Sequence, residues 1–550
     1  MKKLLGLMLC LMISLSVIGA AFAESPTEDP YGRYDETIVY TTGYVLTDQG
    51  ADTLKGTPYE KDTPSNNAYT RYILAVLNVQ NENIFEATPG DSYDQKVSLA
   101  IASRTIPDIM FIEDYSILAE LVEEDMVEDL TAVYNAYACD TVRAAYASYG
   151  DNNPLNTVTF DGKIMAIPKT QLSDAQSFLW LRKDWLDKLG LEIPHTTDEV
   201  AAVLKAFIEQ DPNGTGAADT IGLPVLNTLY GGYPNNHFAI DNFFTAFDAY
   251  PDIWIRNGEG EVVYGSVQPE MKDALALLRD WYAQGLIDKE FTTRTYDDIV
   301  AMIASGRCGA YVGPWWSPFN PAQTSSYANN GAEWINVTAP VGSDGRINGI
   351  NTKPYAGFVG VRKGYAHPEI AMKIVNVISE YSKLDTSDAV KEVKDNQSIA
   401  YFNWPLYCQV QRGDNAQLMS QHVKAVLDGE ADVSTLTTEE ASYYESAVNF
   451  LAAEAEGKKA QSADYSQYMS RMVAIYRIID EPANFMTPAF FETTEMMAMR
   501  WASLEKMELE TVLKIIVGDN DLSSFDSFVS NWERAGGSMI TEEVREATGD

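Results

Sequence analysis

Aromatic residues beside turn-forming residues are the strongest candidates for chemistry in this sequence. The chain contains 10 Trp, 31 Tyr and 20 Phe, and several of these rings follow glycine or proline. Trp315 and Trp316 stand out, because two adjacent rings after Gly313-Pro314 cannot both follow one apolar face of a strand. Flat apolar rings stack on the C–H faces of sugars, while nearby amide, acidic and guanidinium groups bind the hydroxyls. The aromatic residues therefore favour a cleft that binds carbohydrate.

A loop at residues 211–219 has the spacing of a calcium-binding loop. Such loops point every second side chain at a hard cation, which prefers oxygen ligands. Position 12 is Gly222, where an EF-hand has a bidentate glutamate, so only two carboxylates remain. The loop is consistent with a structural calcium ion, and also with a helix-to-strand turn that holds no metal. The candidate ligands, at loop positions 1, 3, 5, 7 and 9, are Asp211, Asn213, Thr215, Ala217 and Asp219.

Motifs of the common enzyme classes are absent from the sequence. It has four histidines, no two of which have the spacing of metal ligands, and it has no H-E-x-x-H, G-x-S-x-G or Walker motif. The four cysteines have no close spacing, which disfavours a disulfide framework and a zinc or redox motif. Two of the 79 acidic residues could still form a glycosidase-like pair, but the sequence does not select one. We therefore expect a binding protein without enzymatic activity and without a required cofactor.

Length and charge limit the kinds of fold and partner. A chain of 550 residues is too long for one hydrophobic core, and it suggests roughly two to four domains or lobes. The formal net charge is -39, and both nucleic acid and anionic membranes attract basic surfaces. We therefore expect no nucleic-acid partner and no membrane-surface partner.

Helical and strand patterns alternate from about residue 69 onward, which is typical of an α/β fold with mostly parallel sheets. Thr196 and Glu199 form a capping box at the start of one helix, and apolar residues follow at i, i+3 and i+4 spacing. A second helix is expected to end at Gly536-Gly537, as at a left-handed C-terminal cap. Strands are predicted at residues 37–40, 108–112, 163–167, 178–181, 221–225, 308–312, 334–337 and 357–361.

The first 23 residues have the pattern of a signal peptide. Lys2 and Lys3 precede an apolar run at residues 4–18, and Ala21-Phe22-Ala23 is an A-x-A cleavage site. Residues 24–36 are rich in Pro, Glu and Asp, and we expect them to form a flexible leader. The protein is therefore expected to be exported, with an uncleaved signal anchor as the alternative.

Several short motifs, in this order along the chain, resemble the family 1 extracellular solute-binding proteins of ABC importers, in the subgroup of oligosaccharide-binding lipoproteins. The resemblance covers about residues 36–545. The motifs are A-S-R-T-I-P-D-I at 102–109, D-G-K-I-M-A-I-P at 161–168, W-L-R-K-D-W-L-D-K-L-G-L at 180–191, S-G-R-C-G-A at 305–310 with G-P-W-W at 313–316, and F-D-S-F through G-G at 525–537.

The resemblance implies a two-lobed, type II periplasmic-binding-protein-like α/β fold. Its lobes are joined by crossing hinge strands, and a sugar is held in the cleft between them by hinge closure. The crossings are expected near residues 164–169 and 357–361. The expected organisation is a first lobe from residues 37–165 and 357–405, a second lobe from 166–356, and a remainder of the second lobe with C-terminal helices from 406–550.

The implied function is that of a monomeric receptor, which captures an extracellular oligosaccharide and delivers it to the transmembrane subunits of an ABC permease. The alternatives are an extracellular glycan-active enzyme and a ligand-sensing partner of a membrane receptor. Trp315 and Trp316 are expected to stack on the sugar from the second lobe, while Asn67 and Asp114, which follow strands of the first lobe, bind hydroxyls. The other expected lining residues are Gln171, Trp180, Tyr230, Tyr355 and Trp404.

Two features depart from the family pattern. Relatives that bind uronate oligosaccharides carry the calcium loop with Asp or Asn at position 5 and Glu at position 10, where this chain has Thr215 and Thr220. Gram-positive relatives carry a lipobox that ends in cysteine, whereas here Leu9 is too bulky for that motif and Cys10 lies too early in the apolar run. We therefore expect an extracellular or envelope-associated protein without a lipid anchor.

Overall fold

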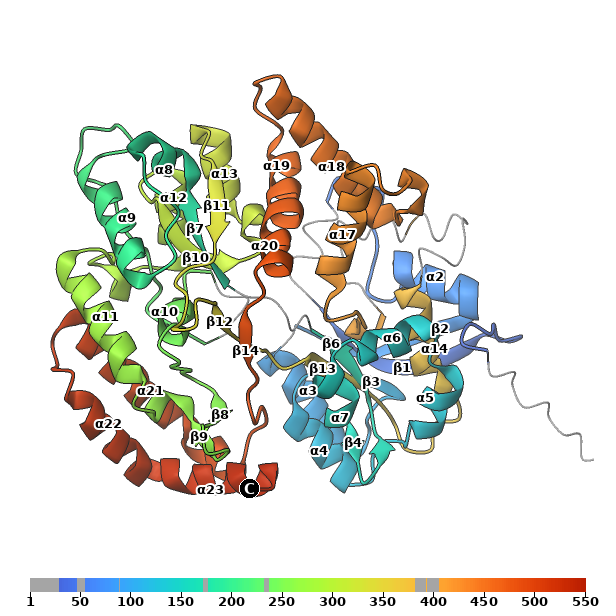
Figure 1. Cartoon of the computed structure of the whole chain (residues 1–550). Coiled ribbons are helices and arrows are strands. Elements are labelled where there is room, and N and C mark those ends of the chain that lie inside the picture. The colour runs from blue at the N-terminus through green and yellow to red at the C-terminus, as the bar shows by residue number, and fades with distance from the viewer. Residues whose placement is uncertain are drawn as a thin grey trace, which may run out of the picture.

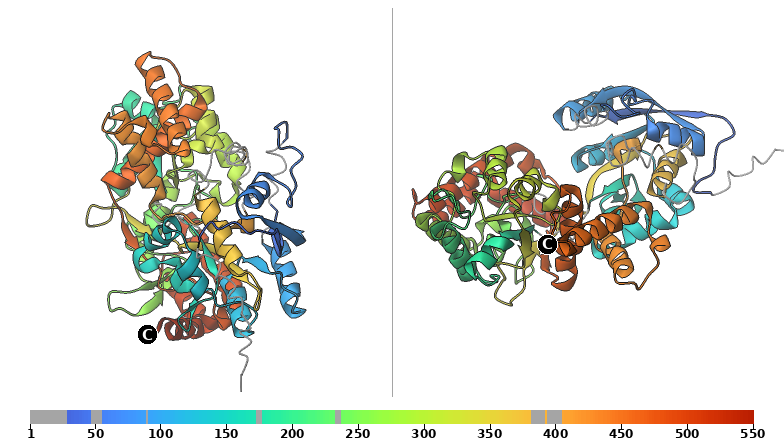
Figure 2. Two further views of the ribbon diagram at one scale, coloured as in Figure 1. Left: turned by 90° about the vertical axis from the view of Figure 1, so that its right-hand side faces the viewer. Right: turned by 90° about the horizontal axis from the view of Figure 1, so that it is seen from above.

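The computed structural model describes residues 29–46, 55–88, 90–171, 177–231, 237–380, 392 and 405–550. Figure 1 shows helices packed around two separate sheets, and Figure 2 shows the two resulting bodies side by side. No helix in these ranges is both long enough and apolar enough to span a bilayer. The expected signal peptide lies outside the described residues.

The first lobe is built on a five-stranded sheet in the order β2-β1-β3-β13-β6. β1 runs parallel to β2 and β3, whereas β13 runs antiparallel to β3 and β6. Every residue of β3 is buried, as expected for a strand covered on both faces. The strands are β1 (Ile38–Val45), β2 (Val79–Ala87), β3 (Ile109–Ile112), β6 (Ile167–Thr170) and β13 (Tyr355–Val361).

Helices of the first lobe pack against this sheet in one hydrophobic core. α2 begins with a capping box, in which the Asn67 side chain accepts from the backbone of Tyr69 and Thr70. A two-stranded ribbon, β4 (Thr159–Phe160) with β5 (Lys163–Ile164), lies beside them. The helices are α2 (Ala68–Leu77), α3 (Asp91–Ala102), α4 (Tyr115–Glu123), α5 (Thr131–Tyr137), α6 (Asp140–Ala147), α7 (Pro154–Thr157) and α14 (Glu369–Ser379).

The second lobe has a three-stranded sheet with β7 (Ser177–Arg182) between β10 (Ala310–Pro314) and β11 (Trp334–Val337). Both pairings are antiparallel. The capping box predicted at Thr196 is confirmed at the start of α9. The helices here are α8 (Lys183–Leu189), α9 (Thr197–Glu209), α10 (Asp241–Thr245), α11 (Met271–Gln284), α12 (Tyr296–Ala304) and α13 (Pro321–Asn330).

The expectation of mostly parallel sheets is wrong, although the α/β class is confirmed. β13 returns to the first sheet after the chain has passed through the second lobe, and it enters the sheet antiparallel to its neighbours. The strand expected at residues 221–225 is reduced to isolated bridges, Ile221 to Cys308 and Leu223 to Ile287. Hydrophobic runs locate strands, but they do not give the direction of partners that are far away in the chain.

The C-terminal part is helical and extends the second lobe. α21, α22 and α23 add apolar side chains to its core, among them Leu504, Phe528 and Val544, whereas α17 to α20 lie beside the boundary between the two bodies in both figures. The expected stop at Gly536-Gly537 is a bend, because the chain turns at Gly536 (φ 134°) and continues as α23. The elements are α17 (Asn415–Leu427), α18 (Thr438–Ala455), α19 (Ser462–Tyr468), α20 (Ile475–Asp480), α21 (Glu495–Val517), α22 (Ser524–Trp532) and α23 (Ser538–Thr548).

The chain crosses between the lobes more than once. β6 leads into β7, and β12 (Asn348–Ile350) leads into β13; β12 also pairs with β14 (Asn484–Met486). A further ribbon, β8 (Trp254–Arg256) with β9 (Val262–Tyr264), belongs to the second lobe. Leu406, Cys408 and Val410 lie in the core of the first lobe, although residues from 406 onward were expected in the second. The difference arises because the apolar side chains of these three residues are buried among those of the first lobe.

Residues 29–36 differ from the flexible leader that composition predicted. The buried Lys373 of α14 donates from Nζ to the carbonyl of Gly32 at 3.0 Å. Asn376 donates from Nδ2 to the carbonyl of Pro30 at 3.2 Å, and the hydroxyl of Tyr34 donates to Glu369 at 2.6 Å. These contacts attach the segment to the first lobe.

Candidate ligand-binding site

A cavity lies where the crossing segments meet the second lobe. Its volume is about 590 Å³, which is within the range of roughly 300–1,000 Å³ that is common for small-molecule sites. Its walls come from the ends of β6 and β12, the start of α10, the turn before β8, and the linker from β14 into α21. The lining residues are Gln171, Gly231, Asp241, Pro251, Asp252, Ile253, Trp254, Ile350, Asn351, Thr352, Lys353, Pro488, Phe490, Phe491, Glu492, Thr493, Met497 and Trp501.

Aromatic rings form one wall of this cavity. Trp501 of α21 is half-buried, and its ring centroid is 6.1 Å from that of the buried Trp254 with 30° between the planes. The ring of Tyr264 meets Trp501 edge-on at 5.0 Å. Phe490 and Phe491 are also half-buried. These supports fix the Trp501 ring, and its remaining surface is available to a flat apolar partner.

Polar groups of the crossing segments form another part of the wall. The backbone N–H of Gln171 donates to the carbonyl of Pro354 at 3.0 Å, and the hydroxyl of Tyr149 donates to the carbonyl of Gln171 at 2.9 Å. The Asn351 side chain donates from Nδ2 to Oγ1 of Thr487 at 2.8 Å. The backbone positions of Gln171 and Asn351 are therefore fixed at the junction of the lobes.

The charged groups that line the cavity are mostly acidic: Asp241, Asp252 and Glu492 against Lys353. Burial raises the pKa of Asp241 to about 6, and its Oδ1 accepts from the backbone N–H of Gly231 at 3.3 Å. The pKa of Asp252 is raised to about 7, first by loss of hydration on burial and then by the charges of Glu508, Glu505 and Asp241. A carboxylate in this wall is therefore held in its charged form at a cost in free energy.

The pKa of Asp241 predicts a pH dependence of stability. The folded carboxyl binds its proton more tightly than the unfolded one, whose pKa is 3.8. Its contribution to the free energy of unfolding is therefore greatest below about pH 4 and falls by about 3 kcal/mol as the pH rises through about 6. We expect the melting temperature of the wild type, relative to Asp241→Asn, to fall over this interval. Thermal melts of both proteins from about pH 4 to about pH 8 measure it, and parallel curves contradict it.

Four of the residues that the sequence predicts to bind the ligand are instead buried in the fold, where they pack or form hydrogen bonds. Trp180 is fully buried in β7 and donates its indole N–H to the carbonyls of Gly313 and Pro314 at 3.2 and 3.3 Å, so it offers no surface to a ligand. Asn67 is buried as the cap of α2. The remaining two are Tyr230, whose hydroxyl donates to Glu508 at 2.7 Å, and Tyr355, which is 3% exposed beside Phe358.

The tryptophan pair lies in a different part of the second lobe. Trp315 is 7% exposed, with the guanidinium of Arg471 4.7 Å from its ring. Trp316 is half-buried and meets the ring of His237 at 4.6 Å. Neither residue lines the 590 Å³ cavity, so stacking by this pair stays a prediction.

Of the nine predicted ligand residues, Gln171 lines the cavity. Asp114 is exposed and caps α4 through Ser116, and Trp404 lies outside the described residues. The aromatic lining residues were missed by the sequence analysis. Phe490 and Phe491 follow Pro488 and so carry the signal used for Trp315 and Trp316, whereas Trp501 lies within the pattern of a long helix and carries no local signal.

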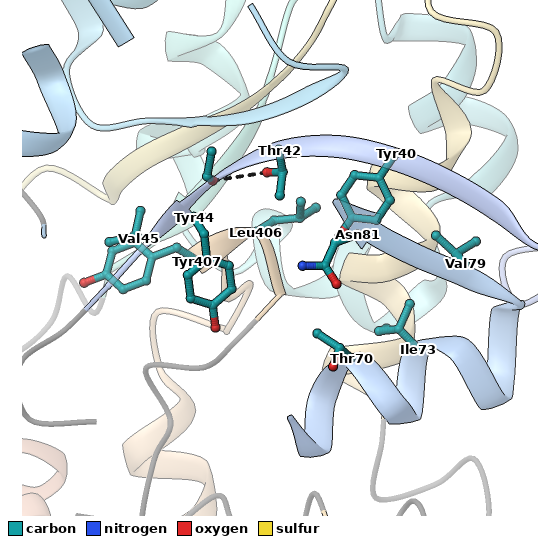
Figure 3. A pocket seen from close by; sticks show the side chains of 11 residues that line it. Tyr40, Thr42, Tyr44, Val45, Thr70, Ile73, Val79, Asn81, Leu406 and Tyr407 are labelled. Carbon is teal, nitrogen blue, oxygen red and sulfur yellow. Dashed lines mark hydrogen bonds between the residues drawn. The ribbon is translucent and has the colours of Figure 1, made fainter. Parts of the chain in front are cut away.

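A second, smaller pocket lies within the first lobe. Figure 3 shows Tyr40 and Tyr44 of β1 and Asn81 of β2 beside Tyr407. Its volume is about 20 Å³, which suits roughly one water molecule. This pocket is too small for a sugar ring.

The loop at residues 211–219 gathers oxygen atoms. Oγ1 of Thr215 is 3.0 Å from Oδ1 of Asp219 and 3.3 Å from Oδ1 of Asn213, and it lies 3.5 Å from the carbonyl of Ala217. Oδ2 of Asp211 accepts from the backbone of Gly216, whereas its buried Oδ1 has no hydrogen-bond partner. The described residues contain no cluster of three or more His, Cys, Asp or Glu side chains suited to a metal. Two carboxylates with neutral oxygens are of the ligand type that a hard cation such as calcium prefers.

Comparisons with known proteins agree with this architecture. The Bacillus subtilis (strain 168) protein named polygalacturonan/rhamnogalacturonan-binding protein YtcQ is 24% identical over 466 residues, covering 82% of this chain and 83% of YtcQ. An extracellular solute-binding protein from Bifidobacterium longum subsp. infantis aligns with a TM-score of 0.63 at 16% identity, over 94% of this chain and 99% of that one. The alginate-binding protein AlgQ2, solved without calcium ion, aligns with a TM-score of 0.58 at 16% identity over the same shares.

The family match covers more than half of the chain. Residues 79–380 match the family described as bacterial extracellular solute-binding protein. This range includes β2, β3, β6 and β13 of the first sheet and all three strands of the second. The two lobes, the crossing segments and the cavity at their junction fit such a receptor, and the chain belongs to the bacterial extracellular solute-binding proteins.

Proposed function

We propose that this protein is the receptor of an ABC importer, and that it captures an oligosaccharide between its lobes and delivers it to the permease. The observation that carries the proposal is the 590 Å³ cavity at the crossing segments, with half-buried aromatic rings in its wall. Sugar rings offer apolar C–H faces to such rings and hydroxyls to polar groups. The name of YtcQ, a polygalacturonan/rhamnogalacturonan-binding protein, supports a glycan as the ligand.

The mechanism follows from where the lining residues are attached. Trp254 and Trp501 belong to the second lobe, whereas Gln171 and Lys353 lie on segments that continue into the first. A ligand that contacts both sets has a differential affinity for the closed arrangement and shifts the population toward it. Closure then presents both lobes to the permease together. We propose that the receptor acts as an exported monomer without a lipid anchor.

A thermal-shift panel of oligosaccharides on the full chain tests the proposal. A ligand at 100 times its Kd is expected to add about 2.7 kcal/mol to the free energy of unfolding. Chromatography of the recovered ligand checks that it is intact, since a receptor releases its cargo unchanged. Cleavage of the ligand would support the glycan-active enzyme, and a panel with no shift would count against the carbohydrate assignment.

We further propose that the loop at residues 211–219 binds a structural calcium ion. We expect calcium at 100 times its Kd to stabilise the protein by about 2.7 kcal/mol, and we expect Asp219→Ala to remove this gain. Glu192→Gln, a change of an exposed acidic residue outside the loop, is the control and should keep the gain. Equal melting temperatures of the wild type with calcium and with chelator would contradict the proposal.

A further inference from the structure

We infer that the cavity selects an uncharged oligosaccharide and discriminates against oligosaccharides of uronic acids. The inference rests on the proposed function, and it separates this chain from YtcQ, which is named for binding polygalacturonan. The inference rests on the acidic residues that line the cavity and on the contacts that the lysine and arginine side chains make elsewhere.

Acidic groups on the second-lobe side face the cavity. Asp241, Asp252 and Glu492 line it, and the charge of the buried Glu508 acts on Asp252. Burial is the main cause that raises the pKa of Tyr355. The charge of Glu492 is the second cause, and the charge of Asp114, in the first lobe, adds to it. Both carboxylates therefore lie close enough to Tyr355 for their charges to act on it. A ligand carboxylate held in the cavity would meet like charges, which costs affinity.

The nearby cations do not balance these acids. Lys353 lines the cavity, but it is exposed to solvent, with Nζ 5.5 Å from the ring of Tyr355. Lys169, on β6, has Nζ 3.7 Å from the ring of Tyr407, and burial lowers its pKa. Arg412 and Arg471 do not line the cavity: Arg412 is paired with Asp414 at 2.8 Å, and the guanidinium of Arg471 lies 4.7 and 4.5 Å from the ring centroids of Trp315 and Tyr443. No arginine lines the cavity among the described residues, so the bidentate partner that suits a carboxylate is missing there.

The same acidic groups suit a neutral sugar. An ionised carboxylate only accepts hydrogen bonds, and a sugar hydroxyl can donate one. Carboxylates therefore bind hydroxyls through charge-assisted hydrogen bonds without any charge on the ligand. Trp501, Phe490 and Phe491 supply the apolar surface for the ring faces. The wall is thus complementary to a polyhydroxylated, uncharged chain.

Matched ligand pairs test the inference. Oligogalacturonate, oligomannuronate and oligoglucuronate are each compared with their carboxyl-reduced forms, which keep length and linkage and lose only the charge. In any pair that binds, calorimetry is expected to show the reduced form binding at least about tenfold more tightly. A uronate that binds as tightly as its reduced form overturns the inference and leaves the proposed function standing. If no member of any pair and no neutral oligosaccharide of the thermal-shift panel binds, the proposed function fails and the inference fails with it.

A charge-removing variant assigns the discrimination to the cavity. The double substitution Asp252→Asn with Glu492→Gln is expected to reduce the ratio of neutral to uronate affinity by about threefold or more. About 0.5 M NaCl should reduce it as well by screening. The control is Asp519→Asn, an exposed acidic residue in the turn after α21, about 27 Å along the helix direction from Trp501. The inference is overturned if neither the double substitution nor salt changes the ratio of neutral to uronate affinity. It is also overturned if the control substitution changes that ratio by the same amount.

Discussion

Replacing Trp501 with alanine is expected to raise the Kd for the bound oligosaccharide by about 10- to 100-fold, which corresponds to about 1.4–2.8 kcal/mol. Trp501 is the half-buried tryptophan of the cavity wall, and Trp254 and Tyr264 hold its ring in place. A fixed ring loses little conformational entropy when a sugar stacks on it, so most of the contact contributes to affinity. Calorimetric titration of the wild type and the variant measures the change.

Three further substitutions distinguish the loss of ring stacking from a disturbance of α21. Trp501→Phe keeps a ring and should recover most of the affinity. Phe491→Ala removes a ring from the linker before α21 and should weaken binding without altering that helix. Trp316→Ala tests the site expected from the sequence. If Trp316→Ala weakens binding while Trp501→Ala leaves it unchanged, the sugar binds at the tryptophan pair.

Local features of the fold could be predicted from the sequence. The capping box at Thr196 and Glu199 involves neighbouring residues, and the strand at 334–337 is β11 as expected. Such features depend on contacts within a few residues, which a linear pattern records. The two lobes were implied by the resemblance of the motifs to the solute-binding family rather than by any local pattern.

The binding cavity could not be predicted in this way. Its lining comes from Gln171, from residues 231–254, from 350–353 and from 488–501, and these segments meet only after the chain has crossed between the lobes. Tyr230 lies next to a turn, as ligand-binding rings often do, yet the packing of the second lobe buries it. An aromatic side chain next to a turn is therefore exposed only where no other helix or loop packs over that turn.

The largest expected loss of stability comes from a glycine in a crossing strand. Gly357→Ala in β13 is expected to destabilise the first lobe by about 3 kcal/mol or more. Gly357 has φ of 104°, a conformation that side chains disfavour, and an added Cβ would lie 2.3 Å from the ring of Phe111 and 2.9 Å from the carbonyl of Ile112. Phe111 is 2% exposed and packs edge-on against Tyr407, so its ring has no room to move.

Gly360→Ala in the same strand is the matched control, with an expected cost of about 1 kcal/mol or less. The Cβ added there would meet Cδ1 of Ile112 at 2.9 Å, at the end of a flexible side chain that can rotate away. Both variants add one methyl group to β13 that meets residues of β3, so the difference between them isolates the backbone conformation and the rigid neighbour. Denaturant unfolding of the wild type and both variants measures the free energies. If Gly360→Ala proves the more destabilising, the tight bend of β13 at Gly357 is not what fixes the strand where it enters the first lobe.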